Sequence, residues 1–340
     1  MYSEKGWLVP VGEAMSRGKV SVIMPARVEP SIRETLDSLL SNAEGDIEVI
    51  LVLDGIIPDY KLPDDKRIRI YHNSRPHGLR PCLNSAIDAA KGKYILKVDA
   101  HCMIGEGWDT ILKADCEDNW IVIPRRFWLD APNWEIKVDQ NGNHGYVDAM
   151  AYVYPFKQVY HPRLTARPWI DYADAHEDEK ITEDMSYQGS MWFTHRAHWH
   201  RIGGMDPNDG YGTFGEEPQE LGLKTQLGPW EGKIMRDKNT WYAHWSKPTI
   251  HWRTDPEIAG RVTDDEFKYA NAWAFNYWWF NKWEKQVHDF QWLVDKFWPL
   301  PGWPENWEWL WPQFDRYPMP APPTIKGTPI DEKKEFQIWR

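Results

Sequence analysis

Residues 92–101, GKYILKVDAH, place a short apolar run directly before an aspartate and a histidine. The run Tyr94–Val98 has the length and composition of a buried β-strand. Because side chains two residues apart in extended chain point to the same side, Asp99 and His101 can bind one divalent cation together. A carboxylate oxygen and an imidazole nitrogen suit Mn²⁺ or another first-row ion. The alternative for this spacing is a solvated loop acid beside a structural histidine.

Similar apolar runs lie on both sides of this strand and alternate with segments of helical periodicity. Ile32, Leu36, Leu39 and Leu40, for example, fall on one face of a helix. Strands that alternate with helices predict an α/β fold with a mostly parallel, Rossmann-like sheet and helices on both faces. The other expected strands are Val20–Met24, Ile47–Leu53, Ile68–His72, Trp120–Pro124 and Lys233–Ala243.

By composition the chain divides into three parts, which we expect to be an N-terminal segment (1–18), a catalytic domain (19–250) and an extension (251–340). The extension is rich in proline and holds 12 of the 23 tryptophans. Each tryptophan can bury a large apolar area, so most of them are expected to pack the extension against the catalytic domain. Residues 125–182 are poorly periodic, which predicts long loops.

Composition excludes several classes of protein. The 340-residue chain is 42% hydrophobic, which is too apolar for a disordered protein, and its net charge of −11 disfavours non-specific binding to nucleic acid. We find no apolar stretch long enough to span a membrane and no secretory signal at its start. Three cysteines cannot form a disulfide framework. We therefore expect a cytoplasmic protein.

The chemistry is expected at the ends of the strands, because ligands of open α/β sheets bind beyond the carboxyl ends of the strands. The acids expected there are Glu29, Asp54 and Asp99. No GxGxxG follows the first strand and no Walker A sequence occurs, which disfavours a dinucleotide site and a P-loop.

Together with five short motifs that occur in the same order, these residues make the sequence resemble the GT-A glycosyltransferases of family 2. The resemblance covers residues 19–245 and implies metal-dependent transfer of a sugar, of the hexosyl type, from a nucleotide-sugar to an acceptor hydroxyl. A UDP-sugar is the expected donor. The motifs, in order, are KVSVIMPARVEPSIRETLDSLL (19–40), IEVILVLDG (47–55), GKYILKVDAH (92–101), HRIGGMD (200–206) and GTFGEEPQELGLKT (212–225).

The resemblance assigns a set of residues to the nucleotide-sugar. Within it, Asp54 contacts the base, and Arg80 is the first candidate for stabilising the charge that grows on the leaving diphosphate. The residues expected at the donor are Pro25, Ala26, Arg27, Glu29, Asp54, Gly78, Arg80, Lys97 and Asp99.

The third position of the metal motif is histidine, as in the polypeptide N-acetylgalactosaminyltransferases. Those enzymes recruit a further histidine late in the catalytic domain, and His244 lies in the corresponding place. The resemblance therefore implies that Asp99, His101 and His244 bind Mn²⁺ or Mg²⁺.

An acid before the helix at Leu221 acts as general base in inverting members of the family. Glu217 matches this position best, and Glu216 is the alternative. The family match favours inversion, whereas retaining enzymes with the histidine-containing motif use the matching acid to hold substrate. The sugar and acceptor pocket is expected to include Gln188, Trp192, Gly204 and Trp245. Trp192 either stacks on a ring there or belongs to the core.

Four stretches resemble glycosyltransferases of bacteriophages and environmental viral genomes: DAHCMIGEGWD (99–109), IPRRFWLDAPNW (123–134), PQELGLKT (218–225) and WLVDKFWPLPGWP (292–304). This resemblance implies a bacterial or phage-infected cell. It also suggests hydroxymethylated pyrimidine of phage DNA as the acceptor, with a glycan as the alternative. A base in DNA would have to leave the stack to reach a buried donor. The remaining alternatives are a metal-dependent hydrolase of nucleotide-sugars and a tryptophan-rich carbohydrate-binding protein.

Overall fold

The computed structural model describes residues 16–27, 29–55, 57–157, 163–206, 210–212, 215–247, 264–310 and 336–338. The strands in these residues are β1 (Ser16–Ala26), β2 (Ile47–Asp54), β3 (Ile68–Asn73), β4 (Gly92–Val98), β5 (Cys102–Ile104), β6 (Trp120–Asp130), β7 (Glu135–Ile136), β8 (Tyr146–Val147), β9 (Met150–Tyr152), β10 (Ala166–Pro168), β11 (Ile181–Asp184), β12 (Met191–His195), β13 (Lys233–His244) and β14 (Phe336–Ile338).

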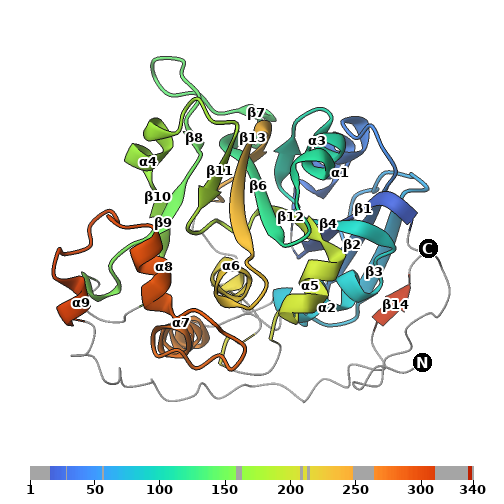
Figure 1. The fold of residues 1–340 in the computed structure, drawn as a ribbon. Coiled ribbons are helices and arrows are strands. Elements are labelled where there is room, and N and C mark those ends of the chain that lie inside the picture. Colours follow the sequence, from blue (N-terminus) through green and yellow to red (C-terminus); the bar gives the residue numbers. More distant parts are fainter. Residues whose placement is uncertain are drawn as a thin grey trace.

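The helices lie on either side of these strands in Figure 1. They are α1 (Ile32–Ser41), α2 (Leu79–Asp88), α3 (Trp108–Asp115), α4 (Ile170–Ala175), α5 (Arg196–Ile202), α6 (Glu217–Leu227), α7 (Asp264–Trp279), α8 (Phe290–Lys296) and α9 (Trp307–Leu310), with a 3₁₀ turn at Pro155–Lys157.

A mixed sheet forms the centre of the described structure. Its strands follow the order β11-β13-β6-β12-β4-β1-β2-β3-β14, while β5 pairs with β13, and β7 and β8 pair with β6. Strands β4, β1, β2 and β3 are parallel to one another, so their carboxyl ends lie at one edge. Asp54 ends β2 there, and Asp99 directly follows β4. The sequence correctly predicts that these acids follow strands.

Strand β12 runs antiparallel to both of its neighbours, β4 and β6, so β6 has the same direction as β4. Beyond it, β6 and β13 are again parallel to each other. The end of β13 also pairs antiparallel with the short β5, where His244 lies opposite Cys102. This pairing carries His244 to the segment that holds His101.

Both faces of the sheet are covered, as the sequence predicts. Alternation along β1 sends Val22 to one face and Ile23 to the other. The first face packs on α1 and α3 through residues such as Leu36 and Trp108. The second packs on α2, α5 and α6 through residues such as Leu83. The α/β class with helices on both faces is therefore confirmed.

A third core joins the aromatic C-terminal region to the rest of the protein. Trp278, Trp279 and Trp303 are buried in it together with Leu223 and Leu227 of α6. Figure 1 shows α7 and α8 beside α6. Most of the tryptophans in this region that the structure describes therefore serve packing. The proline-rich stretch at 311–335 and residues 1–15 lie outside the described residues, and the three-part division stays a prediction.

The middle of the chain is more ordered than its sequence suggests. Strand β6 continues to Asp130, and the residues after it form β7, β8, β9, β10, α4 and β11. These strands are two to four residues long and depend on pairing with distant segments, so they leave little local periodicity.

No helix in the described ranges is both long enough and apolar enough to cross a membrane. The three cysteines, Cys82, Cys102 and Cys116, are free and buried.

Replacing Trp278 by alanine tests the third core. This side chain is fully buried and its indole N–H donates to the Tyr211 hydroxyl at 2.6 Å. Trp278→Ala should lower the free energy of unfolding by about 3–5 kcal/mol, as measured by denaturant titration. Trp309→Ala is the matched control, because Trp309 is 72% exposed, and it should cost less than about 1 kcal/mol. Equal losses for the two variants would contradict the packing role.

Candidate active site

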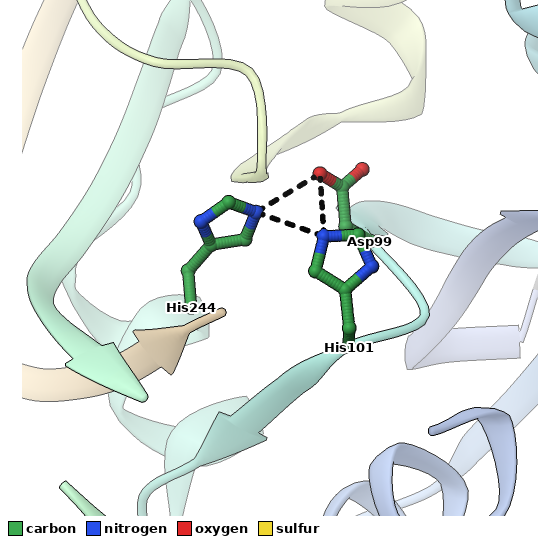
Figure 2. Close-up of side chains that lie close together, drawn as sticks. All are labelled: Asp99, His101 and His244. Carbon is green, nitrogen blue, oxygen red and sulfur yellow. Dashed lines mark hydrogen bonds and ion pairs between the residues drawn. The ribbon is translucent and has the colours of Figure 1, made fainter. Parts of the chain in front are cut away.

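Asp99, His101 and His244 converge on one point at the edge of the sheet (Figure 2). The two imidazole Nε2 atoms are 3.1 Å apart. Asp99 Oδ2 lies 3.4 Å from Nε2 of His244 and 3.9 Å from Nε2 of His101. Two elements far apart in sequence supply these atoms, the turn after β4 and the end of β13. The structure thus brings together the three residues expected to bind metal.

The donor set fits a divalent cation. Ligand atoms at about 2.1 Å from a metal lie roughly 3 to 3.5 Å apart, which is close to the observed separations. One carboxylate oxygen and two imidazole nitrogens suit a first-row ion and leave further positions for other ligands. Both histidines are buried, whereas the Asp99 side chain is 26% exposed, so the cluster opens on this side.

Glu29 orients His101 from the loop between β1 and α1. Its Oε2 lies 3.0 Å from His101 Nδ1, which places the imidazole proton on Nδ1 and turns the Nε2 lone pair toward the cluster. Lys247, just after β13, donates to the other oxygen of Glu29. From sequence, Glu29 is expected at the nucleotide-sugar donor, and no motif points to Lys247. Lys247, Glu29 and His101 therefore form a chain of contacts that orients one histidine of the cluster.

The surroundings set the protonation states of His244 and Asp99. Burial lowers the pKa of His244 to about 4, so its imidazole is neutral at pH 7. Burial alone would raise the pKa of Asp99, but the positive charge of Lys97 and the hydrogen bond with His244 outweigh it. The pKa of Asp99 therefore lies well below its usual range, and the group is a carboxylate.

Lys97 links this cluster to Glu217. Its Nζ lies 2.6 Å from Asp99 Oδ1 and 3.5 Å from Glu217 Oε2, and it also donates to the carbonyl of Gly189. The other oxygen of Glu217 accepts the indole N–H of Trp192 at 2.5 Å. Burial raises the pKa of Glu217, while Lys97 and Trp192 act in the opposite direction. Glu217 is thus a buried, oriented carboxyl group that Lys97 connects to Asp99.

Glu216 faces different surroundings. It adopts the left-handed conformation, with φ of 53°, and turns the chain into α6. Burial raises its pKa to about 8, with Arg163 and Arg80 opposing the shift. Its Oε2 has no hydrogen-bond partner among the described residues. At neutral pH Glu216 is therefore mostly protonated, whereas Lys97 and the Trp192 indole favour the carboxylate form of Glu217.

Asp54 lies at the end of β2 and holds the loop that leads into α2. Its carboxylate accepts the backbone N–H groups of His77 and Gly78 and the side-chain amide of Asn73, at 2.7, 2.9 and 2.9 Å. Gly78 itself has φ of 93°, which a side chain would disfavour. Of the other donor residues expected from sequence, Pro25 and Ala26 end β1 and the half-buried Arg27 follows them.

Two expected site residues have other roles in the structure. Arg80 is fully buried and donates to Glu220 and to the carbonyls of Asp206 and Gly215, so its charge is already neutralised inside the protein. Trp192 is also fully buried and stacks on Trp199, so it has no free face for a sugar. Instead, its indole N–H donates a hydrogen bond to Glu217 and fixes the position of that carboxyl group.

The other residues expected in the sugar and acceptor pocket differ in what they contact. Trp245 is half-buried, and its ring lies edge-on to His101 with centroids 6.4 Å apart. Gln188 accepts hydrogen bonds from the backbone and hydroxyl of Ser190. Gly204 lies apart from these, and its carbonyl accepts a hydrogen bond from Lys224. Arg126 and Trp128, which were not expected at the site, lie on β6 opposite Tyr242 and His244.

Glu29→Gln tests the orientation of His101. The amide retains the size of the side chain but loses the charge that fixes the imidazole, so the affinity for Mn²⁺ should fall about 10- to 100-fold. Titration with Mn²⁺ followed by electron paramagnetic resonance measures this. Glu34→Gln, on the exposed side of α1, is the control and should leave the affinity unchanged. Unchanged affinity in Glu29→Gln would show that Glu29 does not orient a ligand.

Parts of the chain are similar to known glycosyltransferases. Residues 21–167 match the family described as Glycosyl transferase family 2. Over 112 residues the chain is 39% identical to the uncharacterized glycosyltransferase EpsJ of Bacillus subtilis, covering 31% of this chain and 32% of that one. Over 144 residues it is 31% identical to an uncharacterized glycosyltransferase of Methanocaldococcus jannaschii, covering 39% and 47%. The chain thus spans about a third to a half of the length of these relatives.

Among solved structures, the fold is similar to that of GalNAc-T7 with UDP, GalNAc and Mn²⁺. The TM-score is 0.59 at 15% identity, and the similarity covers 77% of this chain and 49% of that chain. At this identity the likeness concerns the fold alone, which is the one expected from the sequence. Residues 21–167 thus match Glycosyl transferase family 2, and the likeness to GalNAc-T7 extends over a larger part of the fold.

Proposed function

We propose that the protein is a metal-dependent glycosyltransferase that moves a hexose-type sugar from a nucleotide-sugar to an acceptor hydroxyl. The observation that carries the proposal is the convergence of Asp99, His101 and His244 at the carboxyl edge of the sheet, with Lys97 and Glu217 beside them. The family 2 match over residues 21–167 supports it. Because GalNAc-T7 was solved with UDP and Mn²⁺, a UDP-sugar and Mn²⁺ are the first donor and metal to test.

Asp99, His101 and His244 would hold the cation at this edge. A divalent cation bound there stabilises the negative charge that develops on the leaving diphosphate. Lys97 holds the Asp99 carboxylate in place through its 2.6 Å contact with Oδ1, which leaves Oδ2 facing the histidines. Glu29 and Lys247 orient His101 from behind.

Glu217 is the proposed general base. A carboxylate can take the proton of the acceptor hydroxyl as that oxygen attacks the sugar carbon, and the reaction then inverts the configuration of that carbon. Trp192 and Lys97 fix the two oxygens of Glu217, and burial raises its pKa toward the working range of a base. Glu216, whose pKa is about 8, is more often protonated at pH 7 and suits this role less.

Metal-dependent nucleotide binding is the first test. UDP with Mn²⁺ should raise the melting temperature of the protein, and UDP without Mn²⁺ should not. Asp99→Asn should remove this effect and the turnover while leaving the fold intact, because Asp99 is a partly exposed residue at a strand end. Asp37→Asn, on the exposed face of α1, is the matched control. Indifference to UDP, GDP and every other nucleotide would overturn the proposal.

The acceptor is addressed by an assay of transfer with a panel of UDP-sugars. Glycans and DNA that contains hydroxymethylcytosine represent the two proposed classes of acceptor. Transfer to one class identifies the acceptor, and turnover that needs no acceptor at all would favour a hydrolase of nucleotide-sugars.

Glu217→Gln tests the base. The turnover number at saturating substrate should fall about 10²- to 10⁴-fold, while the dissociation constant of the donor changes much less. A collapse of donor affinity with turnover preserved at saturation would show that Glu217 binds the donor instead.

The hydrogen bond from Trp192 makes a further prediction about pH. The indole N–H stabilises the Glu217 carboxylate and so lowers its pKa. Removing it in Trp192→Phe should raise this pKa, and the acid limb of the pH–rate profile should move to higher pH. Trp199→Phe alters the neighbouring stacked ring without touching Glu217 and should leave the limb in place. Identical profiles in all three proteins would mean that Glu217 does not control the acid limb.

A further inference from the structure

Arg126 and Trp128 lie on β6 beside the metal-ligand end of β13. The two strands are parallel, and Arg126 pairs in register with Tyr242 while Trp128 pairs with His244. Residues opposite each other on neighbouring strands point to the same face, and neighbouring strands are about 4.8 Å apart. Arg126 and Trp128 therefore share the face of the sheet that carries His244.

The preceding residue, Arg125, points to the other face of the sheet. Arg125 forms an ion pair with Asp148 at 2.6 Å and lies over the ring of Tyr146. Side chains alternate along the strand, so the two adjacent arginines lie on opposite faces of the sheet. Arg125 pairs with Asp148, whereas Arg126 lies on the face that carries His244.

The guanidinium of Arg126 lacks an anionic partner in the part of the chain that the structure describes. Its carbon lies 5.4 Å from the centroid of the Trp128 ring, and its Nε is buried without a hydrogen-bond partner. The two lysines of the site differ, because Lys97 is paired with Asp99 and Lys247 with Glu29. Arg126 is half-buried, and a partly desolvated cation without an anionic partner is costly, so an anionic ligand would stabilise this position.

Arg126 lies close to the cluster of Asp99, His101 and His244. Its partner in the register, Tyr242, is two residues before His244 on β13, and Trp128 lies directly opposite His244. An anion bound between the cluster and Arg126 would therefore be in range of both a cation at the cluster and the guanidinium.

We propose that Arg126, held against the face of Trp128, binds oxygens of the diphosphate of the donor while the cation at Asp99, His101 and His244 binds the same group. This inference rests on the proposed function and deepens it. Guanidinium groups suit this task, because their planar donors form paired hydrogen bonds with phosphate oxygens. Arg126 would thus perform the role that the sequence analysis gave to Arg80, whose charge is already paired with Glu220.

Binding of Mn²⁺, of pyrophosphate with Mn²⁺ and of UDP with Mn²⁺ to Arg126→Gln tests this inference. The affinity for pyrophosphate and for UDP should fall about 10- to 100-fold in calorimetric titrations. The affinity for Mn²⁺ alone should stay the same or rise, because the variant loses a positive charge that repels the cation. Arg126→Lys keeps the charge and should lose less affinity. Arg33→Gln, at an exposed position on α1, is the control.

Each outcome has a distinct meaning. Unchanged affinity for pyrophosphate in Arg126→Gln overturns the inference and leaves the proposed function standing. A parallel loss of affinity for Mn²⁺ alone also overturns it, since it would show a damaged metal site. If the unaltered protein binds pyrophosphate through Arg126 but binds no nucleoside diphosphate, the inference stands and the proposed donor is wrong. If it binds neither with Mn²⁺, both are wrong.

Discussion

The antiparallel pairing of β5 with β13 is the constraint on which the site depends. It brings the imidazoles of His101 and His244, 143 residues apart in sequence, to 3.1 Å. Strand β5 has only three residues, yet α1 fixes its other edge, because Thr35 and Ser38 accept the backbone N–H groups of Cys102 and Ile104. His101 thus directly precedes a strand that is held from both sides.

Several charged side chains near this pairing are largely shielded from water and need partners of opposite charge. Lys97 lies beside both Asp99 and Glu217, and Lys247 beside Glu29, so each of these three acids has a cation within reach. Buried ion pairs contribute little net stability, but losing one partner is costly. The arrangement therefore favours fixed orientation over stability, which a site that must meet a developing charge requires.

Much of the fold and part of the site follow from local sequence, because a strand that ends in an acid leaves a pattern within ten residues. The burial of Arg80 does not, since its partner Glu220 is 140 residues away and only the tertiary structure joins them. Trp192 looks the same in sequence whether it faces a sugar or the core. The sequence alone does not show how Arg125 and Arg126 differ. The register of β6 shows that they point to opposite faces of the sheet. Pairing between distant strands, rather than residue type, decides these cases.

The tryptophan-rich region bears on the chemistry even though it supplies none of the catalytic groups proposed above. Trp278 donates to the Tyr211 hydroxyl, and the Tyr211 ring in turn lies 4.3 Å from the guanidinium carbon of Arg80. Arg80 donates to the carbonyl of Gly215, directly before the left-handed turn that starts α6 and positions Glu217. The same helix buries leucines of its later turns among the tryptophans. A continuous set of contacts therefore runs from the aromatic core to the proposed base, and the packing of the extension is a condition for the geometry of the site.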